Sequence, residues 1–197
     1  MRPLGGGARA CTGAMIRRMP RALLIIDIQN DYFPGGAHPL VDPEVAAANA
    51  RSVLGAFRDS GEPVVHLQHV SATPDAGFMM PGTDGVEIHE TVAPIDGEPV
   101  LQKAEPNGFV GTTLEEELRG RDVDELVVAG MMSSMCVDAT VRAAVDLGFT
   151  ATVVHDACAA PDLRFGGDAI PGKTVHGAFM AALGDGYATL VAADDVQ

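Results

Sequence analysis

Short aliphatic runs that each end at a polar or reactive residue recur along this chain, and they constrain its fold more than any other feature. The clearest lie within residues 21–28 and 124–130, where leucine, isoleucine, valine and alanine follow one another with almost no polar residue between them. Strands this apolar are buried on both faces, as in a parallel sheet that helices cover on each side. The runs therefore predict an α/β protein.

The segments between these runs have helical spacing of their apolar residues or are rich in glycine and proline. Their alternation predicts a three-layer αβα sandwich around a central, mostly parallel six-stranded sheet. Thr112 and Glu115 have the spacing of a capping box at the start of the second helix. Strands are expected near 21–28, 62–69, 98–102, 124–130, 150–155 and 186–192, and helices near 43–60, 111–120, 134–148 and 172–184.

One domain is expected over residues 21–197, because a chain of this length buries most of its apolar surface in one core. Residues 1–20 contain four arginines and no acidic residue, and we interpret them as a flexible N-terminal extension. That stretch has no apolar run long enough for a signal peptide, and the chain contains no run long enough to span a membrane.

The charge balance limits the partners of this chain. Lysine and arginine number 13 against 27 aspartates and glutamates, for a net charge of −14. This excess of negative charge argues against nucleic acid or an anionic membrane as a partner. The three cysteines form neither a disulfide framework nor a C-x-x-C motif, so a reducing cytoplasm is the expected location.

Cys136 is the strongest candidate for a chemical role. It follows the aliphatic run 126–129 and a glycine, and a stretch with helical spacing begins beside it. A thiol in the first turn of a helix faces unpaired N–H groups and the positive end of the helix dipole, which predicts a stabilised thiolate. The alternative is a small buried hydrophobic residue, the commonest role of a free cysteine; Cys158, between alanines, fits that role better.

Asp27 and Lys103 also end predicted strands. A carboxylate at the carboxyl end of a buried strand lies in the crevice where open α/β sheets bind ligands, so Asp27 is an acid–base candidate. Its alternative is a turn or helix cap, although Asn30 and Asp31 suit that role better. For Lys103 the ordinary interpretation is a solvated surface residue.

Three sequence motifs, in chain order, resemble those of the isochorismatase-like cysteine hydrolases, and the resemblance extends from about residue 20 to the C-terminus. The motifs are LLIIDIQNDYF at 23–33, KAEPNGF at 103–109 and GMMSSMCVDATVRAAVDLGF at 130–149. A further stretch, HDACAAPD at 155–162, resembles the segment after the next strand of that family. The resemblance implies a Rossmann-like sheet and a hydrolase.

By this resemblance Asp27, Lys103 and Cys136 form a catalytic triad, and a cis peptide bond joins Met131 to Met132. The backbone N–H groups of Met132 and Cys136 then form an oxyanion hole, and Cys136 forms a thioester with the substrate. The implied reaction is hydrolysis of a non-peptide C–N bond in a small amide, lactam or ureide.

Two features of the family bear on alternatives. Its nicotinamidases bind a metal through an Asp-x-His pair after the second strand, where this chain has VHLQHV at 65–70, so no catalytic metal and no cofactor are expected. Its isochorismate hydrolases cleave a vinyl ether without needing the thiol, and that activity remains an alternative. A non-catalytic small-molecule binder or thiol sensor on the same fold is another.

Four residues beside the triad are candidates for substrate contact: Phe33, His69, Phe109 and Met131. His69 ends its predicted strand at the edge of the sheet where the triad lies. Aromatic residues just past catalytic positions usually pack in the core, and this alternative stays open for Phe33 and Phe109.

His66 is three residues from His69, so the two side chains of an extended strand lie on opposite faces and cannot bind one metal ion together. We expect His66 to be a half-buried histidine with ordinary hydrogen bonds. The long connection 70–97 contains apolar residues and is expected to form a pocket wall or an oligomer contact. The family's habit of assembly points to a homo-oligomer, a dimer or tetramer.

Overall fold

A six-stranded parallel sheet forms the centre of the computed structural model, which describes residues 20–196. The strand order is β3-β2-β1-β4-β5-β8, and every neighbouring pair is parallel. The predicted sheet is thus confirmed. Its strands are β1 (Arg21–Ile26), β2 (Val64–His69), β3 (Val100–Lys103), β4 (Glu125–Met131), β5 (Thr150–Ala159) and β8 (Thr189–Val191).

Alternate residues of the central strands enter two separate hydrophobic cores. Along β1, Leu23 and Ile25 belong to one core, and Leu24 and Ile26 belong to the other. Burying an aliphatic side chain of this size stabilises the fold by roughly 1.5–3 kcal/mol. The unbroken aliphatic sequence of β1 is therefore explained by a strand with a core on each face.

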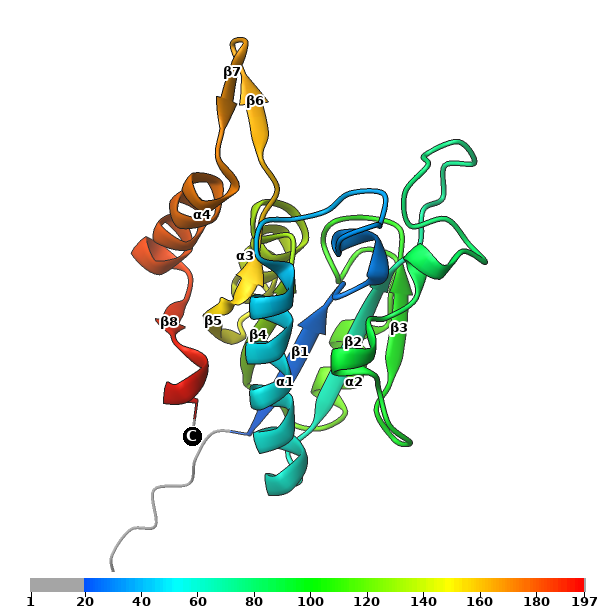
Figure 1. Ribbon diagram of the computed structural model, residues 1–197. Helices are drawn as coiled ribbons and strands as arrows, with labels where there is room; N and C mark the ends of the chain where they lie inside the picture. The colour runs from blue at the N-terminus through cyan, green and yellow to red at the C-terminus, as the bar shows by residue number, and fades with distance from the viewer. Residues whose placement is uncertain (1–19, 197) are drawn as a thin grey trace, which may run out of the picture.

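Helices cover both faces of the sheet and make the predicted three-layer sandwich (Figure 1). The helix α1 (Pro43–Ser60) packs on one face, where Ala50 and Phe57 join the core that contains Leu23. The other face is covered by α2 (Leu114–Arg119), α3 (Asp138–Asp146) and α4 (Gly172–Gly186). None of the helices in residues 20–196 is long and apolar enough to cross a membrane.

The second helix begins later than its sequence predicts, and the proposed capping box is wrong. The hydroxyl of Thr112 donates to the carbonyl of Gly108 at 2.6 Å and accepts a hydrogen bond from the N–H of Leu114 at 3.2 Å. A capping box would require the hydroxyl to bond three residues on, at Glu115. Thr112 instead closes a local turn before α2, whose N-cap is Thr113.

The long connection between β2 and β3 packs back onto the body of the protein. Met79 and Val92 are fully buried in it, and it contains two short 3-10 turns, Asp84–Val86 and Glu90–Val92. The carboxylate of Asp31 holds it by accepting from the N–H of Met79 at 2.6 Å. Its apolar residues thus serve the core that also contains α1.

A β-hairpin that the sequence analysis did not predict separates β5 from α4. Its strands are β6 (Leu163–Phe165) and β7 (Asp168–Ile170), which pair with each other and not with the main sheet. The hairpin projects away from the body beyond the end of β5 (Figure 1). The predicted extension at residues 1–20 lies, except for Pro20, outside the described residues.

Candidate active site

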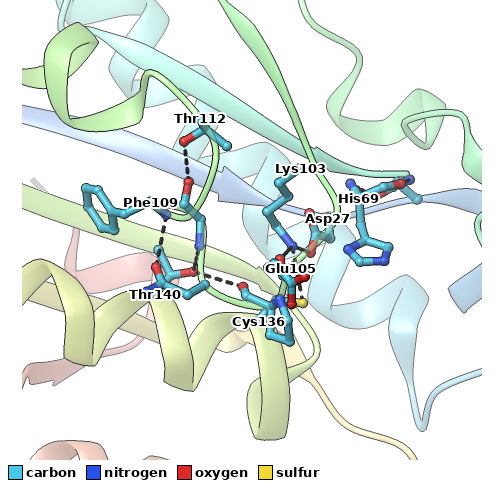
Figure 2. A network of polar contacts seen from close by, with 12 residues as sticks. Asp27, His69, Lys103, Glu105, Phe109, Thr112, Cys136 and Thr140 are labelled. Atoms are coloured by element: carbon cyan, nitrogen blue, oxygen red, sulfur yellow. Dashed lines mark hydrogen bonds and ion pairs between the residues drawn. The ribbon is translucent and has the colours of Figure 1, made fainter. Parts of the chain in front are cut away.

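The three residues of the expected triad meet at the edge of the sheet where β1, β3 and β4 end. Asp27 directly follows β1, Lys103 is the last residue of β3, and Cys136 lies in a π-helical turn, Ser133–Val137, between β4 and α3. All three are buried, with exposed fractions of 0%, 3% and 4%. Figure 2 shows the ammonium group of Lys103 pointing toward both Asp27 and Cys136.

The ammonium group of Lys103 has three acceptors for its three protons. Its Nζ lies 2.7 Å from Oδ2 of Asp27, 3.4 Å from Sγ of Cys136 and 3.1 Å from the backbone oxygen of Glu105. Two hydrogen bonds and one short ion pair leave the ammonium group little freedom to turn. Lys103 is therefore not a solvated surface residue, and it holds the carboxylate and the thiol in one place.

The segment that carries Glu105 is fastened to the helix that follows Cys136. The N–H of Gly108 donates to the hydroxyl of Thr140 on α3 at 2.9 Å, and the hydroxyl of Thr112 donates to the oxygen of Gly108 at 2.6 Å. These bonds belong to the network of polar contacts drawn in Figure 2. The loop after β3 is thus joined to α3 through Thr140 and closed on itself through Thr112.

The backbone at Asp27 adopts a conformation that residues other than glycine rarely take. Its φ is 49°, in the left-handed region, and its N–H donates to the oxygen of Leu67 at 3.1 Å. Such a conformation costs on the order of 1–3 kcal/mol and persists only where the surrounding structure holds it. The chain turns sharply at the end of β1. The residue at this turn is Asp27, whose carboxylate is buried beside Lys103.

The turn that carries Cys136 begins with a close approach of two strands. An added Cβ at Gly130, whose φ is 153°, would lie 2.2 Å from the backbone oxygen of Ile26 on the neighbouring β1. Only glycine fits there. The peptide bond between Met131 and Met132 is cis, and the N–H of Val137 donates to the oxygen of Met132 at 3.2 Å.

Ser133 links this turn to α4, a contact that the sequence analysis missed. Its buried hydroxyl donates to the oxygen of Ala159 at 3.0 Å and lies 2.8 Å from Nδ1 of His176. Because a hydroxyl has one proton, His176 must donate from Nδ1 when Ser133 donates to Ala159. Nothing in the local sequence of either residue signals this contact, since 43 positions separate them.

The expected stabilisation of the thiolate at Cys136 is wrong. Burial of the side chain and the negative charge of Asp27 raise the pKa of the thiol, and the ammonium of Lys103 offsets this only in part. The helix dipole argument failed because it considered the turn alone and not the low dielectric around a buried thiol beside a carboxylate. The resting residue is therefore a neutral thiol that needs a base.

Asp27 has the properties of that base. Burial raises its pKa above the usual carboxyl value, while the charge and the hydrogen bond of Lys103 act in the opposite direction. Burial tends to lower the pKa of Lys103, but the charge of Asp27 and the hydrogen bonds with Asp27 and Cys136 raise that pKa. Lys103 therefore stays charged, and its ammonium group orients the carboxylate of Asp27 and the thiol of Cys136, between which a proton can pass.

His69, one of the four residues expected to contact substrate, lies beside the charged pair of the triad (Figure 2). It is the half-buried last residue of β2, and its ring packs against that of Phe78 with centroids 6.3 Å apart. Both of its backbone groups bond to the side chain of Gln29, at 2.8 Å each. Burial and the charge of Lys103 lower the pKa of His69, so its ring is a neutral group beside the charged pair.

The other three residues, Phe33, Phe109 and Met131, pack against rings or core residues outside the triad. Phe109 stacks on Phe149 at 6.1 Å between centroids, and its ring points away from the triad in Figure 2. Phe33 stacks on His89 at 3.7 Å, and Met131 is fully buried in the core. These placements favour the packing role that the sequence had left open for the two phenylalanines.

His66 is fully buried and not half-buried as expected. Its Nε2 lies 3.0 Å from Glu98, which also forms two hydrogen bonds with Arg58. The prediction failed because Glu98 and Arg58 come from distant segments of the chain. Among residues 20–196 no group of three or more histidine, cysteine, aspartate or glutamate side chains is arranged to hold a metal ion.

Comparison with known proteins gives consistent results. The family model described as the isochorismatase domain matches residues 21–170. An uncharacterised isochorismatase family protein of Bacillus subtilis, YddQ, is 52% identical over 87% of this chain and 96% of its own length. The crystal structure of a putative isochorismatase hydrolase from Oleispira antarctica superposes with a TM-score of 0.88 and 45% identity, covering 92% of this chain and 98% of the other.

Two further relatives have names that state a hydrolase activity. Streptothricin hydrolase of Streptomyces noursei is 38% identical over 84% of this chain and 60% of its own length. Maleamate amidohydrolase of Pseudomonas putida is 35% identical over 68% of this chain and 70% of its own length.

Proposed function

This chain belongs to the isochorismatase family of hydrolases, and from that membership we propose that it is a cysteine hydrolase that cleaves a non-peptide C–N bond in a small molecule. The proposed substrate class is an amide, a lactam or a ureide. The observation that carries the proposal is the single ammonium group shared by a buried carboxylate and a buried thiol, with Nζ 2.7 Å from Asp27 and 3.4 Å from Cys136.

The reaction begins with transfer of the thiol proton of Cys136 to Asp27. The sulfur attacks the carbonyl carbon of the substrate, and the C=O electron pair moves onto oxygen to give a tetrahedral intermediate. A raised thiol pKa makes this base necessary, because little thiolate is present at rest. The raised pKa of Asp27 suits it to accept the proton.

The N–H groups of Met132 and Cys136 are the proposed donors to the developing oxyanion. Removing one such donor from a hydrolase typically costs about 3–4 kcal/mol of barrier. The turn that carries them is held by Gly130 against β1 and by Ser133 against α4. In this proposal the hydrogen bond between Ser133 and His176 acts on catalysis through the position of Met132.

Collapse of the intermediate breaks the C–N bond, and protonated Asp27 gives its proton to the leaving nitrogen. The product is an amine or ammonia and an acyl thioester on Cys136. Asp27, again a carboxylate, then takes a proton from water, whose oxygen attacks the thioester carbon. As the C–S bond breaks, Asp27 returns that proton to the sulfur, which leaves a carboxylic acid product, the thiol of Cys136 and the carboxylate of Asp27. Lys103 remains charged throughout and keeps Asp27 ionised and oriented between steps.

Two considerations support C–N cleavage over the alternatives. The name of maleamate amidohydrolase states action on an amide, and that relative is 35% identical to this chain. A vinyl ether hydrolase does not need a thiol, whereas here Cys136 receives a hydrogen bond from Lys103 and interacts with Asp27. We therefore place the acyl-transfer reaction first.

A thiol sensor is disfavoured by the state of Cys136. Redox-sensing cysteines are accessible and have a lowered pKa, whereas Cys136 is 4% exposed and its pKa is raised. Alkylation by iodoacetamide separates these roles. The rate should rise with pH through pH values above the ordinary thiol pKa of about 8.5, without reaching a plateau there. A plateau below that pH would mean a stabilised thiolate and would contradict the proposed state of the site.

The proposed function is tested by screening small amides, lactams and ureides for release of amine or ammonia. The matched control is Cys136→Ala, and His69→Ala tests the proposed substrate contact. We expect hydrolysis of at least one substrate class by the unmodified enzyme, none by Cys136→Ala, and a raised KM for His69→Ala. Turnover that survives loss of the sulfur would rule out the thioester route.

A further inference from the structure

Gln29 is a fully buried polar residue near the triad that the proposed reaction does not use. It lies two residues after Asp27 in the chain. Its Oε1 accepts from the N–H of His69 at 2.8 Å, and its Nε2 donates to the backbone oxygens of His69 at 2.8 Å and Val86 at 2.6 Å. Both protons of the amide nitrogen thus have an acceptor, and all three partners of the side chain are backbone groups.

The two bonds to His69 require a side chain that offers a donor and an acceptor side by side. Turning the amide over would place the NH₂ group of Gln29 against the N–H of His69, so these partners allow one orientation. An ionised glutamate would have no proton for the two carbonyl oxygens, and a methionine would leave the backbone groups unpaired. A buried polar group without a partner is costly, so among side chains of this length the arrangement is specific to glutamine.

The imidazole of His69 is not held in place by a hydrogen bond at Nδ1. That atom is buried, and no described residue bonds to it. The ring contacts Phe78, with centroids 6.3 Å apart and planes tilted by 33°. Its position depends on this contact and on its own backbone, whose N–H and C=O both bind Gln29. Figure 2 shows the result, with His69 beside Asp27 and Lys103.

We propose that Gln29 is a positioning residue for substrate recognition, which fixes the backbone of His69 so that the imidazole lies beside the triad and contacts the bound substrate. The proposal rests on the proposed function, in which His69 is a substrate contact. The chain segment that carries the base Asp27 also carries the amide that sets the substrate contact, so the spacing between them is fixed. Holding a substrate at a fixed distance from a catalytic group is a large part of catalysis.

The alternative is a brace for the long connection between β2 and β3, because Gln29 also bonds to Val86. Gln68 separates the two roles. It is buried, its Nε2 donates to the same oxygen of Val86 at 3.0 Å, and its Oε1 accepts from Gln102 at 3.1 Å. The hydrogen bonds of the described residues include none between its side chain and His69. Gln68 is therefore a matched control that shares the bond to the connection and lacks the bonds to His69.

The position of His69 is tested by NMR titration of its ring in the full chain, with His69→Ala to assign the signal. Burial and the charge of Lys103 lower its pKa, while the charges of Asp27 and Glu105 act in the opposite direction. In Gln29→Met the ring should leave this environment, and its pKa should rise toward the ordinary value of 6.5. Gln29→Glu, which keeps the shape of the side chain, should give the same direction of change.

Two controls show whether the change is confined to His69. Gln68→Met should leave the pKa of His69 as it is in the unmodified protein. His66 is buried in the same strand, has a pKa lowered by burial, and should keep that pKa in every variant. An unchanged His69 in Gln29→Met, or a matching change in Gln68→Met or at His66, would overturn the proposal.

Kinetics test whether Gln29 acts through His69. On a substrate that the enzyme hydrolyses, Gln29→Met should raise KM by about 10-fold with kcat within a few-fold, as removal of a substrate contact does. The same substitution should have no further effect in a His69→Ala background, because residues that act as a unit are not additive. Gln68→Met should change KM by less than about 2-fold in both backgrounds. Additive effects of Gln29→Met and His69→Ala would contradict the proposal.

The two measurements also separate this proposal from the proposed function. A screen without hydrolysis of any substrate would reject the proposed function, and the titration would still decide whether Gln29 positions His69. A shifted His69 pKa in Gln29→Met together with an unaltered KM in His69→Ala would show that the ring does not contact substrate. That result would overturn the role of Gln29 in recognition and leave the thioester reaction standing.

Discussion

The strand β3 has a cluster of charged side chains at each end, and the two clusters differ in what they do with a carboxylate. Glu98 lies just before β3 and meets Arg58 and His66. Lys103 ends β3 and meets Asp27 and Cys136. Both clusters combine one carboxylate, one cation and one titratable ring or thiol, so the difference between them does not lie in the class of residue.

The cluster at Glu98 satisfies its carboxylate fully. Glu98 receives hydrogen bonds from Arg58 at 2.7 and 2.8 Å and from the N–H of Ile95 at 3.1 Å, and His66 lies 3.0 Å away. Burial acts to raise the pKa of Glu98, but these bonds lower it to about 2. Its charge is thus stabilised, and we interpret the cluster as structural.

The carboxylate in the cluster at Lys103 is less stabilised and more readily accepts a proton. Asp27 is fully buried, its pKa is raised by burial, and the ammonium that offsets this also bonds to Cys136 and to the oxygen of Glu105. The comparison teaches that the number of donors on a carboxylate, and not its burial alone, separates a structural ion cluster from a reactive one. The predictions below test that separation.

The largest expected effect is the loss of the nucleophile. Cys136→Ala should reduce kcat by at least about 10⁴-fold, because no other group in the site can form the thioester. Steady-state kinetics on the substrate found in the screen measure this. Cys158→Ala, a second buried thiol outside the triad, is the control and should retain activity within several-fold.

The next effect tests the base. Asp27→Asn should reduce kcat by about 10³-fold with little change in KM, as expected when a general base is lost. Glu98→Gln should leave kcat within a few-fold of the unmodified enzyme. Equal losses in the two variants would mean that both clusters serve catalysis and would remove the distinction between them.

The free energy of unfolding should depend more on Glu98 than on Cys136, the reverse of the order expected for activity. Glu98→Gln removes the partner of Arg58 and His66 and should lower the free energy of unfolding by roughly 2–3 kcal/mol, measured by urea denaturation. Cys136→Ala should change it by less than about 1 kcal/mol, because the thiol leaves only a small void. An unaltered stability of Glu98→Gln would show that this ion cluster contributes little.

The smallest predicted effect is a dependence on pH. The pKa of Glu98 falls from 4.5 to about 2 on folding, so its contribution is fully present above the unfolded value and is lost as the pH falls through about 2. The gap in unfolding free energy between the unmodified protein and Glu98→Gln should therefore narrow from pH 4.5 downward. A gap that stays constant over that range would contradict the lowered pKa.

The pH dependence of activity should reflect a raised carboxyl pKa, that of Asp27, and not a lowered one. Because the pKa of Asp27 is raised, its basic form is lost at a higher pH than that of an ordinary carboxylate. The acid limb of kcat/KM should thus lie above the ordinary carboxyl value of about 4. An acid limb at or below that value would place the working base elsewhere.

The elements that could be predicted from the sequence are those marked by a pattern of neighbouring residues. The aliphatic runs of β1 and β4 predict their strands, and a parallel sheet brings strand ends to one edge, so Asp27 and Cys136 were expected there. Lys103 was expected beside them only because of the family resemblance. The hairpin β6–β7 escaped prediction because strands of three residues show no measurable period. The sequence predicts one helix from residue 134 onward, because the π-helical turn Ser133–Val137 is too short to show a period of its own.

Properties that depend on long-range contacts could not be predicted. The raised pKa of Cys136 follows from burial and from Asp27, which lies more than a hundred positions away in the chain. The bond from Ser133 to His176 and the cluster at Glu98 likewise join distant segments. Only the assembled sheet and its packed helices reveal these contacts.

The proposed thioester offers the most direct test of this account. A substrate that the enzyme hydrolyses is mixed with it, the reaction is quenched with acid within one turnover, and the protein is digested for mass spectrometry. The peptide that contains Cys136 should gain the mass of the acyl group, and Cys136→Ala should gain none and release no amine. Full turnover without any adduct on Cys136, or amine release by Cys136→Ala at the normal rate, would contradict the account.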